Sequence, residues 1–165
     1  MSDPYQSLFI ANQQALAAQP EKAVVNFSVE SRGEDGLHRK VRIREFTVDV
    51  DEPLGLGGSD KAASPVELAL AALATCQEIT YRLHAAALGI PLRDVSVQLQ
   101  GTLDLRGFFS VDPEVRPGFT DIQGTVKFDS SASQDALKAL KESVDRHCPV
   151  LDLFRNPTPV SIAIA

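Results

Sequence analysis

The most prominent hydrophobic pattern in the sequence is a helix-length stretch over residues 65–88. Its first half is almost entirely apolar, which is typical of a helix that is buried on every side. The start of this helix has the pattern of a capping box, with Ser64 at the N-cap and Glu67 at the third helical position. Pro65 stands at the first helical position, where its missing N–H costs no hydrogen bond of the helix. Gly89 follows the last apolar residue and is a common helix end. The pattern therefore predicts one long helix over this range.

Shorter periodic segments lie on both sides of this helix. Two of them have the spacing of amphipathic helices, over residues 3–18 and 133–146. Alternating or β-branched segments predict strands over residues 22–30, 37–50, 94–105, 119–128 and 158–165. The segment over residues 37–50 is expected to form one strand or two. The order is helix, β-hairpin, long helix, β-hairpin, helix and strand. It predicts an α+β fold with antiparallel sheet rather than a doubly wound fold.

The sequence is consistent with a single domain over residues 1–165. This length suits one domain, and the chain has neither an internal repeat nor a long linker. We divide it into an additional N-terminal helix (1–20), an N-terminal β-hairpin (21–53) and a helix–hairpin–helix–strand remainder (64–165).

Composition and charge narrow the classes of function. The chain carries 16 Lys and Arg residues against 22 Asp and Glu residues, a net charge of −6. We expect no nucleic-acid partner, because binding to a phosphate backbone needs a basic surface. No apolar run approaches the ~20 residues of a membrane helix, and the N-terminus lacks the features of a secretory signal. We therefore expect no membrane partner and a cytoplasmic location.

Two cysteines, Cys76 and Cys148, are the main candidates for chemistry. They are too few for a secreted disulfide scaffold, and they lie too far apart in the sequence for a CxxC redox motif or a zinc knuckle. Together with three scattered histidines they show no metal-ligand spacing. We therefore expect no metal and no cofactor.

The position of each cysteine leaves two interpretations open. Cys76 lies in the apolar part of the long helix, where a thiol is either an inert core residue or, with a cation from another segment beside it, a nucleophile. Cys148 precedes Pro149 and can serve as the N-cap of the following turn, where backbone N–H groups favour a thiolate. The alternative for Cys148 is a buried, inert cap. Further along the long helix, Glu78 and Arg82 are spaced for a surface ion pair.

Three segments together resemble the OsmC/Ohr family. They are VDVDEP at residues 48–53, LGGSDKAASPVELALAALATCQE at residues 56–78, and HCPVLDLFRNPTPV at residues 147–160. The Ser-Pro-x-Glu helix start, the alanine-rich run ending at a cysteine and the later Cys-Pro make a specific combination. The resemblance covers roughly residues 24–165.

The resemblance implies an OsmC-like fold, in which antiparallel sheets wrap around the two long central helices of an intertwined homodimer. In the peroxidase branches of the family, the helix cysteine attacks the O–O bond of an organic hydroperoxide. Its sulfenic acid then condenses with the second cysteine to a disulfide, which a small dithiol or a dihydrolipoyl protein reduces. Carried onto this chain, Cys76 is the peroxidatic thiol and Cys148 the resolving thiol of an organic hydroperoxide reductase.

The residues that would activate the thiol depart from the family pattern. Peroxidase members usually have a glutamate ten residues before the reactive cysteine, which orients an arginine from the amino-terminal hairpin. That position is Val66 here. Glu67 and Glu78 are the nearby acids, and Arg44 and Arg32 are the candidate arginines.

Two other functions stay open. A non-enzymatic dimer of the same family would bind an apolar ligand in the interface cavity, with Cys76 inert, and Val66 favours this alternative. A hot-dog-like thioesterase also wraps a central helix in sheet, and Glu67 or Glu78 would supply its acid. For the reductase we expect an apolar pocket lined by Phe108, Phe109 and Leu73.

Overall fold

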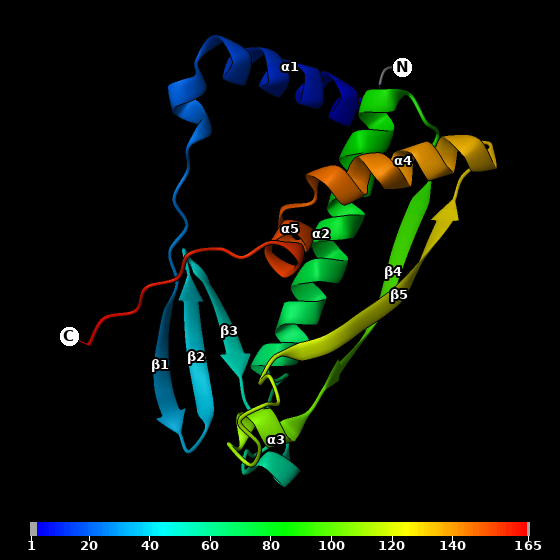
Figure 1. The fold of residues 1–165 in the computed structure, drawn as a ribbon. Coiled ribbons are helices and arrows are strands. Elements are labelled where there is room, and N and C mark those ends of the chain that lie inside the picture. Colours follow the sequence, from blue (N-terminus) through cyan, green and yellow to red (C-terminus); the bar gives the residue numbers. More distant parts are fainter. Residues whose placement is uncertain (1–2, 165) are drawn as a thin grey trace. The chain divides into compact units, whose positions relative to one another are not determined.

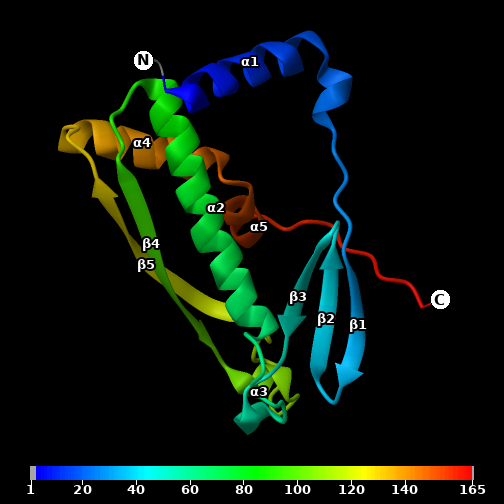
Figure 2. The same cartoon turned by 180° about the vertical axis from the view of Figure 1, so that it is seen from behind.

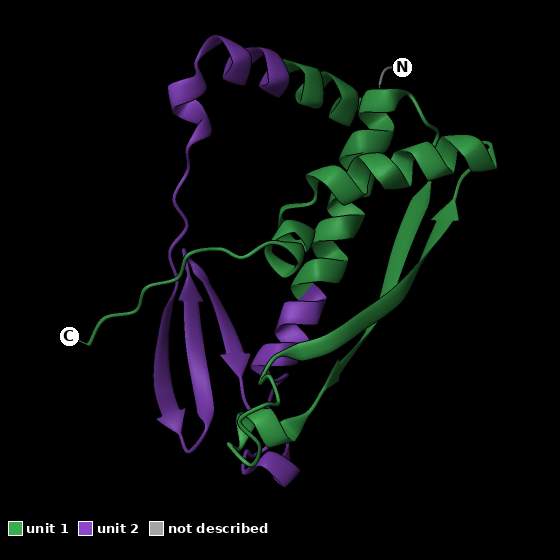
Figure 3. Ribbon diagram, viewed as in Figure 1, with its two compact units in different colours: residues 1–11, 72–165 green, residues 12–71 purple. Residues whose placement is uncertain are grey.

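The computed structural model describes residues 3–164 and combines helices with two antiparallel sheets (Figure 1). This confirms the predicted α+β class. The chain forms two compact units, one of residues 12–71 and the other of residues up to 11 together with those from 72 onward (Figure 3). The long helix, α2 (Pro65–Leu88), contributes its first residues to the smaller unit and the rest to the larger one. The predicted N-terminal helix over residues 3–18 is also confirmed, as α1 (Pro4–Ala18).

The sheet of the smaller unit is a three-stranded antiparallel meander. Its strands pair in chain order and are β1 (Glu30–Asp35), β2 (His38–Ile43) and β3 (Phe46–Val50). The two turns contain Gly36 and Arg44, whose φ angles are 53° and 56°. Residues 37–50, predicted as one strand or two, form two strands, because the chain reverses again at Arg44.

The predicted strand over residues 22–30 is wrong. The chain there forms a short 3₁₀-helix, η1 (Pro20–Ala23), and then runs without a sheet partner until β1 begins at Glu30. Val24 is 80% exposed and Phe27 is 91% exposed. Alternation reports how well side chains suit a sheet, but a strand also needs a neighbouring edge. Among the described residues, this segment has none.

Asp51 fixes the loop that joins β3 to α2. Its carboxylate is 1% exposed and accepts four hydrogen bonds, from the N–H of Glu52 (2.9 Å), the N–H and hydroxyl of Ser59 (3.1 and 2.7 Å) and the N–H of Lys61 (3.1 Å). These bonds, led by the Ser59 hydroxyl, hold the pKa of Asp51 far below its ordinary value. Within this loop, which includes η2 (Leu54–Leu56), a Cβ at Gly58 would lie 1.8 Å from the Glu52 carbonyl oxygen, so only glycine fits there.

We expect the replacement Asp51→Asn to lower the urea midpoint of unfolding at neutral pH and to weaken its dependence on pH. The folded-state pKa of Asp51 is depressed, so its bonds contribute stability above the ordinary pKa near 3.9 and lose it as the pH falls toward the folded value. An amide replaces one carboxylate oxygen by an NH₂ group facing other donors. Urea unfolding followed by circular dichroism between pH 7 and about pH 3 measures both effects.

Asp135→Asn is the matched control, because the Asp135 side chain is 95% exposed on another helix. Equal changes in the two variants would contradict the role assigned to Asp51.

The larger unit contains the greater part of α2, a long hairpin and three shorter helices. Its elements are β4 (Asp94–Leu103), α3 (Leu105–Phe108), β5 (Phe119–Asp129), α4 (Gln134–His147) and α5 (Pro149–Arg155). β4 and β5 pair antiparallel over their lengths, with Asp94 opposite Asp129. Figures 1 and 2, from opposite sides, show this hairpin beside α2 and α4 crossing the C-terminal part of α2.

Helix α2 confirms the predicted long helix at both ends. The N–H of Ser64 donates to the Glu67 carboxylate at 2.7 Å, and the N–H of Glu67 donates to the Ser64 hydroxyl oxygen at 3.4 Å. This is the predicted capping box. The helix ends at Leu88, and Gly89 follows it with a φ angle of 66°, a conformation that glycine adopts readily.

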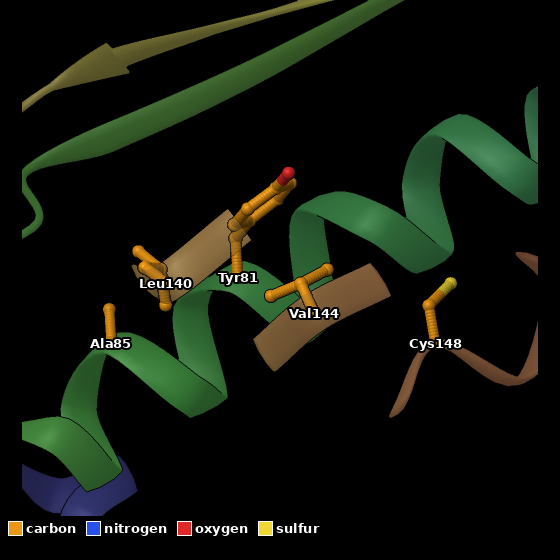
Figure 4. Packing of buried hydrophobic residues seen from close by; sticks show 5 residues of the cluster. All are labelled: Tyr81, Ala85, Leu140, Val144 and Cys148. Atoms are coloured by element: carbon orange, nitrogen blue, oxygen red, sulfur yellow. The ribbon is translucent and has the colours of Figure 1, made fainter. Parts of the chain in front are cut away.

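The core of the larger unit lies between α2 and α4 (Figure 4). Its fully buried members are Tyr81, Ala85, Leu140, Val144 and Cys148. The Tyr81 ring also packs edge-to-face on the Phe128 ring of β5, with 5.1 Å between the centroids. Cys76 packs against the same cluster. Both cysteines therefore belong to one core.

The end of the chain differs from its prediction. Residues 158–164, predicted as part of a strand over 158–165, form no strand, and Ala165 lies outside the described residues. Ile162 is 91% exposed and Ile164 is fully exposed, so the apolar side chains of this alternating segment lie in solvent. Before this segment, the turn expected after Cys148 is a helix, α5. In the part of the chain that the structure describes, no helix is long and apolar enough to cross a membrane.

Candidate active site

The two cysteine sulfurs lie next to each other, although 72 residues separate them in the sequence. Cys76 is half-buried in the middle of α2, and Cys148 is 2% exposed at the junction of α4 and α5. Both are free thiols, and the thiol of Cys148 donates a hydrogen bond to the Cys76 sulfur at 3.4 Å. The two sulfurs are thus in contact as thiols, at a separation longer than the roughly 2.05 Å of a disulfide bond.

The chain turns sharply at Cys148, and this turn brings its sulfur to α2. The N–H of Cys148 donates to the Val144 carbonyl (2.9 Å) and ends α4. Pro149 occupies the first position of α5, and the Cys148 carbonyl accepts from Asp152 (3.1 Å). The prediction that Cys148 caps the following segment is confirmed, although its sulfur makes no capping hydrogen bond. Figure 4 shows the thiol at one end of the row of core residues.

The environment of Cys148 favours the protonated thiol, which contradicts the thiolate expected at this N-cap and agrees with the alternative of a buried cap. Burial is the largest effect and raises its pKa, and the neighbouring Cys76 sulfur raises it further. The N–H groups of Leu151 and Val150, at the start of α5, lower the pKa of Cys148, but by less than burial and Cys76 raise it. Cys148 is therefore held as the hydrogen-bond donor of the pair, and Cys76 is the acceptor.

The candidate arginines, Arg32 and Arg44, both lie on the sheet of the smaller unit. Arg32 forms an ion pair with Glu30 at 2.6 Å, and Arg42 forms a second with the same carboxylate at 2.7 Å. Their charges line an open hollow of about 230 Å³ on this sheet. Arg44 instead lies over the ring of Phe46, 5.0 Å from its centroid. Arg32 therefore shares one carboxylate with Arg42, and Arg44 keeps a contact with an aromatic face.

The candidate acids have different partners. Glu67 is bound in the capping box with Ser64, which lowers the pKa of its carboxyl group. Glu78 accepts a hydrogen bond from the N–H of Val97 at 2.8 Å and so joins α2 to β4 two residues beyond Cys76. Sequence reasoning could not find this bond, because strand β4 is brought to the helix only by the fold.

The predicted surface ion pair between Glu78 and Arg82 is wrong. The Arg82 guanidinium donates to the carbonyl oxygens of Leu92 and Arg93, at 2.5 and 2.8 Å, in the connection that leads to β4. An ion pair at this helix spacing contributes only about 0.2–0.5 kcal/mol to helix stability. Glu78 and Arg82 each bind backbone groups instead, which the fold brings to them from the β4 strand and the connection before it.

The side chains expected to line an apolar pocket lie in different environments. Leu73 is 4% exposed on α2, whereas Phe108 and Phe109 are 59% and 54% exposed and pack edge-to-face on each other, with 5.0 Å between the ring centroids. The pocket stays a prediction. Over residues 3–164, no group of three or more His, Cys, Asp or Glu side chains is arranged to hold a metal ion.

The family follows from the sequence that surrounds this cysteine pair. A family model described as OsmC-like protein matches residues 58–163, which include both cysteines and most of the elements around them. The chain belongs to the OsmC-like family. The resemblance that the motifs indicated is thereby confirmed. A search of curated proteins gives no match.

Solved structures of OsmC-like proteins share the fold. An OsmC-like protein from Mycoplasma pneumoniae is 17% identical, with a TM-score of 0.70 over 79% of this chain and 88% of that one. An organic hydroperoxide resistance protein from Legionella pneumophila is 24% identical, with a TM-score of 0.62 over 80% and 90%. Another from Elizabethkingia anophelis is 18% identical, with a TM-score of 0.63 over 80% and 89%.

Proposed function

We propose that this OsmC-like chain reduces organic hydroperoxides to alcohols, with Cys76 as the peroxidatic cysteine and Cys148 as the resolving cysteine. The observation that carries the proposal is the pair of free sulfurs 3.4 Å apart in the core of a chain of this family. Two structures of the same fold bear the name organic hydroperoxide resistance protein, which supports the substrate class.

The reaction balances in three steps. The Cys76 thiolate attacks the terminal oxygen of R–O–OH, the O–O bond breaks, and the alkoxide takes a proton to leave as the alcohol while Cys76 becomes a sulfenic acid. The Cys148 thiol then attacks the Cys76 sulfur, an S–S bond forms and water leaves. A dithiol finally reduces the disulfide by two thiol–disulfide exchanges and is itself oxidised to a disulfide.

The burial of the two sulfurs supports this division of roles. Cys76 is the less buried of the two residues and its sulfur accepts the hydrogen bond of the pair, which suits the sulfur whose electron pair attacks the peroxide. Cys148 is buried and protonated, which keeps it out of the first step and leaves it in contact with the sulfur that becomes oxidised. In this scheme each cysteine has the environment that its step requires.

For the activating cation we propose Arg44 ahead of Arg32, because Arg32 already pairs with Glu30. Glu78 acts as a positioning residue, since its bond to Val97 fixes the turn of α2 that follows Cys76. Glu67 serves the helix start through the capping box and has no part in the chemistry.

Reduced, purified protein should consume about one equivalent of cumene hydroperoxide per chain without added reductant, and should turn over repeatedly when a dithiol is supplied. A colorimetric peroxide assay measures both. Hydrogen peroxide serves as the comparison substrate and should react more slowly, because it lacks an apolar group. If the reduced protein leaves cumene hydroperoxide unchanged, the enzymatic function is excluded, and the non-enzymatic, ligand-binding alternative takes its place.

The active unit of this function is proposed to be a homodimer. Ile79 is 63% exposed in the middle of the long apolar helix, on the larger unit. Val160 and Ile162 are also at least 79% exposed, in a segment with strand-like alternation. Apolar side chains exposed to this extent mark an interaction surface, and a second copy of the chain is the occupant that the family implies.

Light scattering after size exclusion should give a mass of twice the 17.8 kDa chain. The replacement Ile79→Glu should shift the protein toward the monomer, because it places a charge in the proposed interface. Gln134→Glu adds the same charge at an exposed position of α4 and should leave the dimer intact. A monomer in the unmodified protein would contradict the proposed assembly.

A further inference from the structure

Two histidines from different helices lie together beside the cysteine site. His84 belongs to α2, His147 ends α4, and their ring centroids are 5.1 Å apart with 37° between the ring planes. Phe9 of α1 packs edge-on against the ring of His84, with 5.3 Å between the centroids. The ring of His84 is therefore placed between Phe9 and His147.

A single residue of α4, Ser143, binds the Nδ1 atom of both rings. The Nδ1 of His147 lies 2.7 Å from the Ser143 carbonyl oxygen, and the Nδ1 of His84 lies 2.9 Å from the Ser143 hydroxyl oxygen. A carbonyl oxygen can only accept, so Nδ1 of His147 carries the hydrogen and Nε2 of the neutral ring has a free lone pair. The hydroxyl group can accept from His84 in the same way. Neither Nε2 atom has a hydrogen-bond partner among residues 3–164.

The Nδ1 contacts of both rings are of the kind that metal-binding histidines make. In such sites Nδ1–H donates to an oxygen that fixes the ring, and Nε2 binds the metal. Two rings bound through Nε2 to one tetrahedral ion, with Zn–N bonds of about 2.0–2.1 Å, place their centroids roughly 5 Å apart. The observed separation of 5.1 Å matches this value.

The exposure of the two rings also suits metal binding. His147 is exposed, which gives an ion access from solvent. His84 itself is half-buried.

We propose that His84 and His147 form a binding site for a divalent transition-metal ion of the Zn²⁺ class, with water in the remaining coordination positions. Imidazole nitrogen suits zinc, copper and nickel ions, and a site with open positions binds reversibly. The bound ion joins α2 to α4 at the residue that immediately precedes Cys148. The site uses no residue of the proposed peroxide chemistry and stands independently of it.

Zinc titration by isothermal calorimetry of the full chain tests the proposal. The Cys76→Ser/Cys148→Ser variant is used as the background, because paired thiols also bind zinc. One saturable site per chain is expected, and His147→Gln and His84→Gln should each weaken it by at least about tenfold, or about 1.4 kcal/mol. His38→Gln is the matched control, because His38 pairs with Asp49 in the smaller unit, and it should leave the isotherm unchanged.

A second measurement uses the unmodified chain and needs no variant. The ring resonances of His84 and His147 should shift on addition of zinc in an NMR spectrum, and those of His38 should stay in place. His147→Gln keeps the test informative if His84→Gln fails to fold, because His147 is exposed. Absence of saturable binding, binding that survives both substitutions, or binding that His38→Gln abolishes would each overturn the site.

Discussion

Replacing Cys76 with serine should reduce the rate of cumene hydroperoxide consumption about a thousandfold or more, to the level of a blank without protein. The serine hydroxyl does not ionise near neutral pH, so the attacking thiolate sulfur is replaced by a neutral oxygen that is only weakly nucleophilic. The substitution nearly conserves volume and leaves the core of the larger unit filled. The measurement is the initial rate in the colorimetric peroxide assay with a dithiol present.

The control for this variant is its stability rather than its activity. Urea unfolding of Cys76→Ser should resemble that of the unmodified chain, so that loss of activity reports chemistry and not unfolding. Equal peroxide consumption by the two proteins would remove Cys76 from the reaction and with it the proposed function.

The second large effect is expected for Cys148→Ser, which should separate the first step from the second. Cys76 can still be oxidised, so one equivalent of peroxide is consumed, but no intramolecular thiol remains to form the disulfide. The sulfenic acid should accumulate, and dimedone should trap it as an adduct on Cys76 that mass spectrometry detects. Turnover with a dithiol should fall strongly, because reduction must then occur directly at the sulfenic acid.

The matched comparison is the unmodified chain under the same pulse of peroxide, in which the dimedone adduct should be scarce because Cys148 reacts first. An unmodified turnover rate in Cys148→Ser would show that resolution does not use Cys148. Absence of any adduct together with loss of the first equivalent would mean that Cys148, and not Cys76, meets the peroxide.

The parts of the fold that local chemistry determines could be predicted from the sequence. Helix α2 was predicted at both ends, because the capping box at Ser64 and the left-handed Gly89 are signals within a few residues of the helix. The role of Cys148 as an N-cap followed in the same way from the proline beside it. The family was predicted from motifs around these signals, and the family comparison confirms it.

The strands at the two ends of the chain could not be predicted correctly in this way. Residues 22–30 and 158–164 alternate as strands do, yet they have no neighbouring edge within the described chain. Alternation measures the fit of side chains to a sheet, whereas strand formation depends on backbone partners that lie far away in the sequence. In the proposed homodimer, a second copy of the chain is the source of such partners.

The same limit applies to the contacts around the site. Glu78 was expected to pair with Arg82 one turn away, but it binds the N–H of Val97 on a strand 19 residues further on. The grouping of His84 and His147 around Ser143 also depends on the crossing of two helices, since 59 residues separate His84 from Ser143. Residue types identified both cysteines as candidates, but only the fold shows that their sulfurs are in contact.

The most direct test of the account follows the two sulfurs themselves. Reduced protein is exposed to one equivalent of cumene hydroperoxide, quenched with an alkylating agent under denaturing conditions and analysed as the intact chain and as peptides. Resolution of Cys76 by Cys148 predicts a chain that has lost two hydrogen atoms, carries no alkyl group and yields one peptide pair linked between Cys76 and Cys148. A chain that remains fully reduced and doubly alkylated would contradict it.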